Sequence, residues 1–396
     1  MDVLSKPITL TCEHRVFFTR HAFAPGNRAL LEVLAGKVLV FIDAGVAEGR
    51  AGIEEEIQRW FQLHQPRVTL LRPPAILEGG EACKNGWRHV TALWQAINDV
   101  GLDRHSTVLA IGGGAFLDLV GFASATAHRG IRLVRMPTTT LSQGDGGVGV
   151  KNGVNFFDKK NWVGTFAVPW AVVNDFAFLD ALPARAKRAG LIEAVKVALL
   201  RDGVFFEAIE SRAEELAALQ PAAVEFLVRR GAELHHEHIA TGGDPFELGS
   251  ARPLDFGHWV AHKIEPSSGY RIEHGEAVAI GMAADLIYAR RIGLLEAADC
   301  ARILRLIHRM GFVLYDEELG RVDSAGRLQI LRGLEEFREH LGGELTITLV
   351  TGIGQRLEVH EMDPIHVAAA VKELRENFSS ARTPSALAVA CAGIEC

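Results

Sequence analysis

Short, almost wholly apolar runs alternate with helix-like segments through the first half of the chain. Runs without polar alternation are typical of strands buried on both faces, and their alternation with helices predicts a parallel, doubly wound sheet. The expected strands are Arg15–Thr19, Lys37–Asp43, Arg67–Arg72, Thr107–Gly112, Arg132–Pro137 and Ala171–Asp175. The expected helices between them are Asn27–Leu34, Gly52–Leu63, Trp87–Val100 and Ala115–Ala127.

The pattern changes near Pro183, after which helical periodicity dominates. Strand-like sequence returns only around Leu345–Val350. The expected helices are Ala184–Leu200, Phe205–Leu219, Pro221–His238, His258–Ile264, Glu276–Ile292 and Leu295–Met310. We therefore predict an α/β domain over residues 1–182 and a mostly α-helical domain over residues 183–396.

Composition excludes several classes of partner. The 42 Lys and Arg residues against 49 Asp and Glu give a net charge of −7, which disfavours nucleic acid. No apolar run reaches the ~18 residues that a membrane span needs, and the first residues do not resemble a signal peptide. The five cysteines are scattered without a CxxC pair, as expected in a reducing compartment, so we expect a cytoplasmic protein.

Glycine is enriched, with 40 residues, and several glycines stand where a strand meets a helix. Gly112–Gly114 joins an expected strand to an expected helix, a place where backbone N–H groups can approach a phosphate. Leu117 stands where a GxGxxG motif would have its third glycine, so a tight turn without a ligand remains an alternative. Asp43 at a strand end, and Glu81 and Lys84 beside a second glycine turn, favour a dinucleotide.

Residues 137–164 form a long stretch rich in glycine, threonine and asparagine, with little periodicity. Connections of this length are usually functional or disordered, and the interleaved valines and aromatic residues disfavour disorder. Lysines beside glycines, such as Lys151, can bind phosphate through charge and backbone N–H groups together. We predict a loop that binds phosphate or sugar, with an ordinary surface loop as the alternative.

The helical half contains carboxylates and imidazoles at spacings that suit a metal ion. Glu193 and Lys196 are three residues apart and share a helix face, and His258 and His262 are four apart. His274 opens a further expected helix. A carboxylate with two or three imidazoles suits zinc and leaves a position for substrate. A structural role remains the alternative for each histidine alone, and the absence of HExxH disfavours a zincin protease.

Six motifs, in this order, resemble the 3-dehydroquinate synthase superfamily, the sugar phosphate cyclases. They are GGGAFLDLVGFASATAHRG, PTTTLSQGDGGVGVKNGVN, KKNWVGTF, AGLIEAVK, DFGHWVAH and HGEAVAIGM. The resemblance spans about residues 35–295 and implies a Rossmann-like NAD-binding domain, a helical metal-binding domain and an active site between them. It also implies transient oxidation by NAD+, β-elimination of phosphate, reduction and intramolecular aldol addition.

The resemblance implies a role for individual residues of this chain. The implied metal ligands, for Zn2+ or Co2+, are Glu193, His258 and His274. The residues implied around NAD are Asp43, Glu81, Lys84, Gly113, Gly114, Asp118, Thr138, Thr139 and Lys160. The residues implied to face the substrate are Asp145, Lys151, Asn161, Lys196, His262, His238, Arg252 and Asp255. The resemblance also implies that Arg129 reaches the substrate phosphate, across the interface of a homodimer as in members of the family.

Departures from the family pattern bear on the substrate. Dehydroquinate synthases have Asn at the position of Asp255 and Lys at that of His238, and their E-x-G-x-R motif here has one inserted residue before Arg252. Their C-terminal Lys has no clear counterpart near Glu339. These changes disfavour a carboxylated substrate, because like charges repel at short range. They favour sedoheptulose 7-phosphate, and retention of His262 favours the branch that forms 2-epi-valiolone.

Four other functions remain open on the sequence. Two lie within the superfamily, namely a 2-epi-5-epi-valiolone synthase and a 3-dehydroquinate synthase proper. A metal-dependent polyol dehydrogenase would use the same cofactors but would accumulate NADH and release no phosphate. A non-catalytic binding protein would keep the fold but lose ligands, and the presence of Glu193, His258, His274 and Lys151 argues against it.

Overall fold

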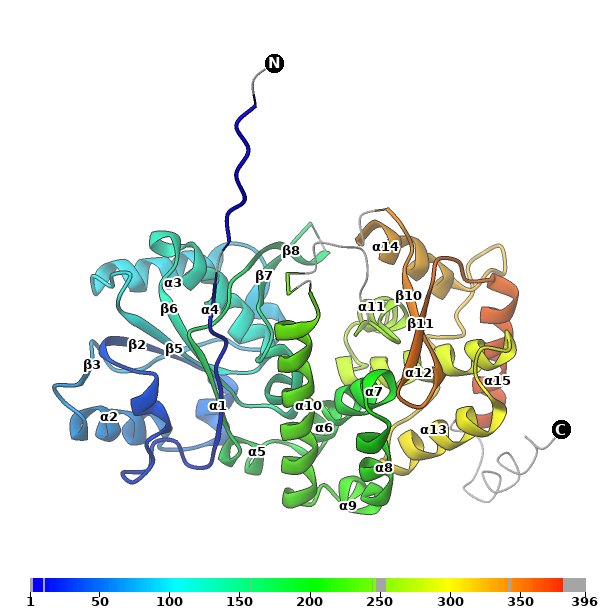
Figure 1. Ribbon diagram of the computed structural model, residues 1–396, viewed down its shortest axis with the longest axis horizontal. Coiled ribbons are helices and arrows are strands. Elements are labelled where there is room, and N and C mark those ends of the chain that lie inside the picture. The colour runs from blue at the N-terminus through cyan, green and yellow to red at the C-terminus, as the bar shows by residue number, and fades with distance from the viewer. Residues whose placement is uncertain are drawn as a thin grey trace. The chain divides into compact units, whose positions relative to one another are not determined.

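The computed structural model describes residues 3–9, 11–157, 159–243, 245–246, 254–340 and 343–379. The chain forms two compact units, which are described separately below (Figure 1). Unit 1 comprises residues up to Thr138 together with Gly146–Ala181. Unit 2 comprises Thr139–Asp145 and the chain from Leu182 onward, so the short segment that contains Asp145 lies with the helical unit.

Unit 1 is built on a seven-stranded sheet in the order β1-β9-β6-β5-β2-β3, with β4 also paired to β2, and every pairing is parallel. The strands are β1 (Val16–Thr19), β2 (Gly36–Asp43), β3 (Val68–Leu70), β4 (Ala75–Leu77), β5 (Thr107–Gly112), β6 (Arg132–Pro137) and β9 (Ala171–Asp175). The helices are α1 (Ala44–Gly49), α2 (Ile53–Leu63), α3 (Arg88–Asp99), α4 (Gly114–Thr126) and α5 (Ala177–Asp180). The predicted doubly wound sheet is confirmed.

Alternate residues of the central strands enter two separate cores. Val40 and Ile42 of β2 pack with Ile57 of α2, in a core that also holds Trp60. Phe41, between them in sequence, packs in the other core with residues of α3 and α4. Because helices cover both faces, the strands are apolar throughout, which explains why they lack the alternation of a half-exposed sheet.

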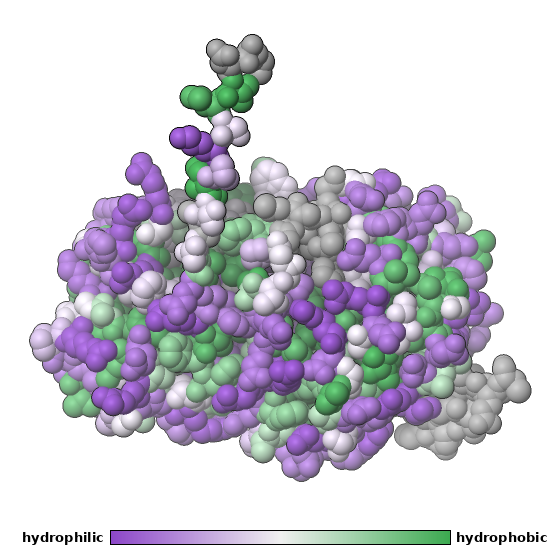
Figure 2. All heavy atoms as spheres, viewed as in Figure 1, coloured by the Kyte–Doolittle hydropathy of each residue, from purple (hydrophilic) through white to green (hydrophobic). Residues whose placement is uncertain are grey.

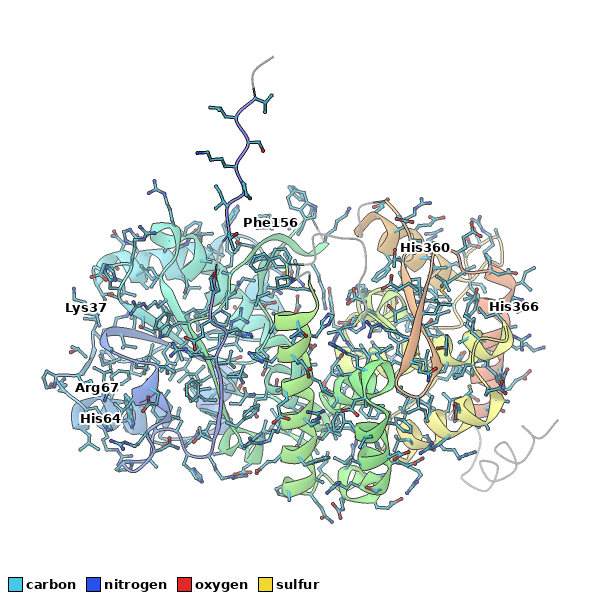
Figure 3. All side chains as sticks on the ribbon, viewed as in Figure 1. Lys37, His64, Arg67, Phe156, His360 and His366 are labelled. Carbon is cyan, nitrogen blue, oxygen red and sulfur yellow. The ribbon has the colours of Figure 1, made fainter. Side chains whose placement is uncertain are left out.

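The segment 137–164 is more regular than the sequence analysis predicted. It contains a turn of π-helix over Ser142–Gly146, followed by an antiparallel hairpin of β7 (Lys151–Phe156) and β8 (Lys159–Phe166). Phe156, labelled in Figure 3, anchors the hairpin, since its ring centroid lies 4.8 Å from that of Trp87. The predicted helix over residues 27–34 is wrong, because only a short 3-10 turn, Ala29–Glu32, forms there.

Unit 2 is largely helical, as predicted, with one antiparallel hairpin. Its helices are α6 (Ala184–Ala189), α7 (Leu191–Arg201), α8 (Gly203–Ser211), α9 (Ala213–Ala217), α10 (Pro221–Thr241), α11 (His258–Ser267), α12 (His274–Arg291), α13 (Ala297–Arg309), α14 (Arg332–His340) and α15 (Pro364–Phe378). Its strands are β10 (Ile347–Gly352) and β11 (Gln355–Val359). A short 3-10 turn, Gln329–Leu331, leads directly into α14, and in unit 1 another, Glu81–Lys84, precedes α3.

Hydrophilic side chains predominate on the face of each unit shown in Figure 2, with apolar residues in small patches. Within the described residues, none of the helices combines the length and the apolar character needed to cross a bilayer.

Candidate active site

Three side chains that are distant in sequence meet in unit 2. Glu193 projects from α7, His258 is the first residue of α11 and His274 is the first residue of α12. One possible ligand atom from each lies within 4.8 Å of the others. The Glu193 Oε1 atom is 3.9 Å from His258 Nε2 and 3.6 Å from His274 Nε2. The structure thus brings together the three residues that the family resemblance implied as metal ligands.

The outer nitrogens of both imidazoles are already engaged by other groups. His258 Nδ1 is 3.1 Å from the carbonyl oxygen of Phe256, and His274 Nδ1 is 2.9 Å from Oε1 of Glu265, a carboxylate only 3% exposed. A carbonyl can only accept, so Nδ1 of His258 must donate and its Nε2 carries the lone pair in the neutral ring. In the same way, a carboxylate that accepts a hydrogen bond from the outer nitrogen of a metal-binding imidazole fixes the orientation of the ring.

The charges of the cluster fit a divalent cation. Burial alone would raise the pKa of Glu193, but Lys196 and His274 lower it to about 2, so the carboxylate is ionised. Among the described residues, neither of its oxygens has a hydrogen-bond partner of regular geometry, although Lys196 Nζ lies 2.5 Å from Oε2. A buried anionic oxygen facing two Nε2 atoms is a donor set suited to zinc or cobalt.

Metal binding is expected to strengthen as the pH rises. Burial lowers the pKa of His274, but Glu193 and Glu265 outweigh burial and raise it to about 10 in the metal-free protein. Burial and Lys196 instead lower the pKa of His258, so only His274 holds a proton that the metal must displace. The dissociation constant for Zn2+ should therefore fall about tenfold per unit between about pH 6 and 8.

Calorimetric titration in two buffers of different ionisation enthalpy measures this effect, with about one proton released per ion. An affinity that does not change with pH, or binding without proton release, would contradict the assignment of His274 as a ligand.

A second group of polar side chains lies beside the cluster. Asp145 Oδ1 is 2.8 Å from Nδ1 of His235 on α10. Burial tends to raise the pKa of Asp145, but His235 and Lys196 together lower it well below its usual range. Burial likewise tends to lower the pKa of Lys196, whereas Glu193, Asp145 and Asp255 raise it, so the ammonium persists at neutral pH. His235, which contacts Asp145, lies on α10 about one turn before the predicted His238.

His262 lies one turn along α11 from His258, and the two ring centroids are 5.5 Å apart. Its ring also lies near that of Phe337 of α14, with a centroid separation of 6.3 Å. Lys263 is ion-paired with Glu336 at 2.5 Å, which ties α14 to α11. The predicted substrate-facing histidine therefore has a metal ligand on one side and an apolar ring on the other.

In unit 1, the predicted nucleotide-binding residues meet at the carboxyl ends of the strands. Asp43 ends β2, accepts a hydrogen bond from Gly45 N (2.9 Å) and lies 3.5 Å from Gly113 N, while Gly114 opens α4. A Cβ on Gly79 would lie 2.0 Å from Asp43 Oδ1, so this contact requires glycine. A helix N-terminus beside a strand-end carboxylate is a suitable place for a phosphate next to a ribose.

A second polar group links the start of α4 to the β7–β8 hairpin. The ammonium of Lys84, only 2% exposed, is 2.8 Å from Oδ2 of Asp118 and also donates to the side-chain oxygen of Asn161. Asn155 donates to Glu81 Oε1 at 2.9 Å, and its own Oδ1 accepts from Asn161 N at 2.9 Å. Four predicted residues thus join one network, and Asn161, predicted to face the substrate, is tied to residues predicted around NAD.

Most of the remaining predicted residues lie in unit 1. Thr138 is buried and its N–H bonds to Gly112 O at 3.1 Å, whereas the Thr139 hydroxyl is 2.8 Å from that of Ser142 in unit 2. Lys151 begins β7 with an exposed side chain, and Lys160 is on β8. Arg129 is exposed, with φ of 62°. Arg252 lies outside the described residues.

Besides His235, two residues of the site were missed from the sequence. Glu265 is seven residues after His258 on the same helix, and this i, i+4, i+7 spacing with His262 was a usable signal. Asp285 is fully buried in α12 and accepts from Gly257 N (3.0 Å) and Trp259 Nε1 (2.9 Å), which fixes the turn that leads into His258. No periodicity distinguishes Asp285, because its helix is buried on nearly all sides.

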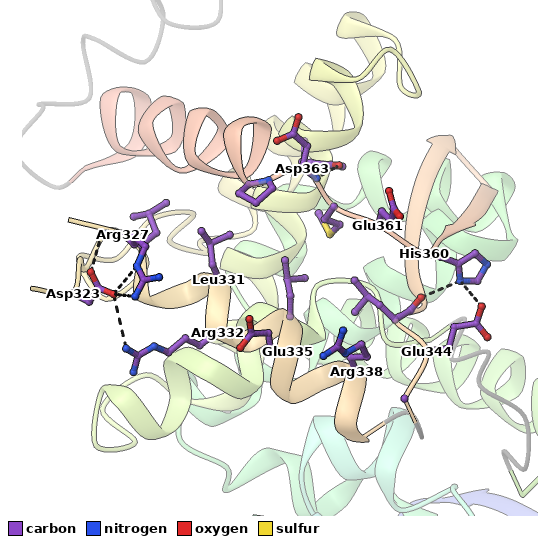
Figure 4. Close-up of a pocket in the computed structure, with 17 residues that line it drawn as sticks. Asp323, Arg327, Leu331, Arg332, Glu335, Arg338, Glu344, His360, Glu361 and Asp363 are labelled. Carbon is purple, nitrogen blue, oxygen red and sulfur yellow. Dashed lines mark hydrogen bonds and ion pairs between the residues drawn. The ribbon is translucent and has the colours of Figure 1, made fainter. Parts of the chain in front are cut away.

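Unit 2 also contains a separate cavity of about 1170 Å3 (Figure 4). It lies on a different face of α14 from the one that carries Phe337. In and just before α14, the cavity is lined by Leu331, Leu334, Glu335 and Arg338. Phe337 of the same helix faces His262 instead. Among the described residues, none of those predicted for catalysis or metal binding lines the cavity, and His360, which does line it, is hydrogen-bonded to Leu345 O. It is therefore distinct from the metal cluster.

Unit 1 has a parallel sheet with a glycine turn at its strand ends, and unit 2 has a Glu–His–His cluster. This combination is typical of enzymes that use a nucleotide together with a metal ion. Residues 74–189 match the family "3-dehydroquinate synthase N-terminal", and residues 190–326 match "3-dehydroquinate synthase C-terminal". The chain belongs to the 3-dehydroquinate synthase family and is an enzyme.

Individual relatives have different names within the family. A 2-epi-5-epi-valiolone synthase of Streptomyces glaucescens is 38% identical over 266 residues, 67% of each chain. A 2-epi-valiolone synthase of Actinosynnema mirum is 34% identical over 320 residues, 79% of this chain and 83% of the relative. The structure of a 2-epi-5-epi-valiolone synthase from Streptomyces hygroscopicus subsp. jinggangensis 5008, with NAD+ and Zn2+ bound, superposes with a TM-score of 0.84 at 28% identity, covering 94% and 99% of the two chains.

Proposed function

We propose that this enzyme converts sedoheptulose 7-phosphate to 2-epi-valiolone with release of phosphate, using NAD+ and Zn2+ or Co2+. The observation that supports it most is the buried Glu193, His258 and His274 cluster with the Lys196 ammonium beside it. A metal ion at this cluster would polarise a ring hydroxyl, and NAD+ would supply its transient oxidation. The bound NAD+ and Zn2+ in a structural neighbour support the same pair of cofactors here.

The residues of unit 2 would hold the sugar and manage its protons. Lys196 stays protonated at neutral pH and would donate a hydrogen bond to the oxygen that gains negative charge. The Asp145 carboxylate, paired with His235 at 2.8 Å, would accept hydrogen bonds from sugar hydroxyls. His262 would lie near enough to the cluster to exchange a proton with the substrate.

The residues of unit 1 would hold NAD and the phosphate. Asp43 would accept from ribose hydroxyls and the N-terminus of α4 would face the pyrophosphate. Lys151 and Asn161 would bind the substrate phosphate, which departs by β-elimination and can take the proton from the neighbouring carbon itself. In this chemistry the protein mainly positions reacting groups.

The side chains around Lys196 favour a substrate without a carboxylate. Asp255, one of the groups that raise the pKa of Lys196, adds negative charge where dehydroquinate synthases have a neutral Asn. A substrate carboxylate there would be repelled. This supports sedoheptulose 7-phosphate over the carboxylated heptulosonate phosphate of a dehydroquinate synthase.

Purified enzyme with NAD+, Zn2+ and sedoheptulose 7-phosphate should release one phosphate per sugar without accumulating NADH, and NMR should identify the cyclic product. Carboxylated heptulosonate phosphate should give at least about 100-fold slower release, because one repelled charge costs several kcal/mol. Phosphate release only from the carboxylated sugar would identify a dehydroquinate synthase. Stoichiometric NADH without phosphate would identify a polyol dehydrogenase.

The NMR spectrum also tests the stereochemistry. A 2-epi-5-epi-valiolone product is the alternative, and the Streptomyces glaucescens relative of that name supports it. Our proposal of 2-epi-valiolone fails if that product forms instead, while the class of reaction would stand.

We also propose a homodimer in which Arg129 contributes to the phosphate site of the partner. Arg129 lines a cavity of about 540 Å3 in unit 1 together with Arg15, Arg104 and Arg132, so the cavity is rich in positive charge. Sedimentation that shows only a monomer at the concentrations of the activity assay would contradict this proposal.

A further inference from the structure

Arg135 of β6 is a fully buried arginine to which the sequence analysis gave no role. Its guanidinium lies inside the bend formed by residues 146–152, where five oxygen atoms surround it. The acceptors are the carbonyl oxygens of Gly146 (3.5 Å), Gly147 (3.3 Å), Gly149 (2.8 Å) and Lys151 (3.0 Å), and Oδ1 of Asn152 (2.6 Å). Four are main-chain atoms, so the contact fixes the path of the backbone rather than one side chain.

No carboxylate is among these hydrogen-bond partners, and Asp118 supplies the opposing charge only from a distance. Burying a cation in this way is unfavourable unless hydrogen bonds replace its water. A leucine or valine would be the ordinary residue at the centre of such a sheet. Hydrogen bonds to five acceptors therefore offset the free-energy cost of burying the guanidinium. Because these acceptors belong to residues 146–152, the role of Arg135 concerns that segment.

The end of the bend is held by the pairing of Lys151 with Phe166 and by the buried side chains of Val148 and Val150, but its glycines depend on contacts of the main chain. Gly146, Gly147 and Gly149 have no side chains, and residues 147–150 form neither helix nor strand. Glycine loses more conformational freedom on ordering than any other residue. A rigid planar group with several donors in fixed directions can order such a segment by binding successive carbonyl groups.

Gly121 of α4 provides the space that this arrangement needs. A Cβ at Gly121 would lie 1.8 Å from Asn152 Oδ1 and 3.3 Å from Nη2 of Arg135. An alanine would displace the Asn152 amide and with it the shortest of the five hydrogen bonds. Arg135, Gly121 and Asn152 thus form one unit, which we call the loop clamp.

We propose that the loop clamp holds residues 146–152 in one conformation and thereby positions Lys151 for the phosphate of the substrate. Arg135 is a positioning residue and does not touch the substrate. The functional half of this inference rests on the proposed function, because Lys151 contacts the phosphate only if the substrate is a sugar phosphate. The structural half, the ordering of the loop, does not depend on it.

Hydrogen exchange tests the ordering directly. Arg135→Met and Gly121→Ala should each raise amide exchange at least about tenfold in peptides covering residues 146–157, with little change in the remaining sheet. Arg50→Met is the matched control, since Arg50 is a partly buried arginine of unit 1 that pairs with Glu56 at 2.7 Å. Its exchange in residues 146–157 should equal that of the wild type. Because Gly121→Ala leaves Arg135 in place, it decides the question if Arg135→Met does not fold.

Kinetics test the positioning. Arg135→Met should lower kcat for phosphate release about 100-fold, the effect of a misplacement of about 1 Å, and leave the affinity for NAD+ within about twofold. Arg135→Lys should not restore activity, because one ammonium has three donors for five acceptors. Guanidinium ion at millimolar concentration should restore Arg135→Ala at least about tenfold, which a general loss of stability would not show.

Unchanged exchange in both Arg135→Met and Gly121→Ala would overturn the loop clamp whatever the activity. Increased exchange with unchanged kcat, or full activity in Arg135→Lys, would overturn the positioning of Lys151. If the wild-type enzyme does not act on sedoheptulose 7-phosphate, the proposed function fails, while the exchange results still decide whether the clamp exists.

Discussion

Replacing Glu193 by glutamine is expected to remove metal binding and phosphate release together, each on the order of 1000-fold. Glutamine keeps the shape of the side chain but loses the negative charge that faces Nε2 of His258 and His274. The change also leaves the buried Lys196 without its ion pair at 2.5 Å. Calorimetric titration with Zn2+ and a phosphate-release assay measure the two losses.

Thermal unfolding separates this effect from a general loss of stability. Zn2+ should raise the unfolding temperature of the wild type, because a ligand that binds only the folded state stabilises it, and should not raise that of Glu193→Gln. Glu210→Gln is the matched control, since Glu210 is a helical carboxylate of unit 2 paired with Arg302 at 2.7 Å. It should keep both Zn2+ binding and activity. Normal Zn2+ affinity in Glu193→Gln would show that the metal is bound elsewhere or by the histidines alone.

Strands were predictable where burial on both faces made them apolar throughout, as in β5 and β6. The β7–β8 hairpin was not, because close packing required glycines and buried amides in place of alternating apolar residues. A Cβ on Gly164, for example, would lie 2.8 Å from Asn152 O. Close approach also explains why residues 184–200 are not one helix. The break falls at Gly190, whose Cβ would lie 2.1 Å from Leu141 N.

The metal cluster was predictable in part, because spacing places His258 and His262 on one face of a helix. Periodicity could not show that Glu193 and His274, on two other helices, would meet them, and the family resemblance supplied that step. The sequence analysis gave His235 no role, because its contact with Asp145 depends on the packing of the Thr139–Asp145 segment within unit 2. Arg135 gave no signal, since a single arginine in an apolar strand is common at an exposed edge.

Replacing Lys196 by methionine should lower kcat on the order of 1000-fold and yet preserve metal binding, the opposite division from Glu193→Gln. Methionine fills a similar volume but cannot donate to the oxygen that becomes negative in the reaction. Removing the ammonium also makes the cluster more negative, because Glu193 and Asp145 lose a shared counter-charge. The affinity for Zn2+ should therefore stay equal or increase.

The pH dependence of the wild type gives an independent check on Lys196. Because the neighbouring carboxylates raise its pKa, the ammonium remains charged through the neutral range, and activity should show no loss from its deprotonation between about pH 6 and 9. Lys196→Met with near-normal kcat, or with lost Zn2+, would contradict its role as a proton donor beside the metal. A Lys196→Met variant that binds Zn2+ and NAD+ but releases no phosphate would separate catalysis from cofactor binding. Glu193 and Lys196 would then have different roles, although they are only three residues apart on one helix.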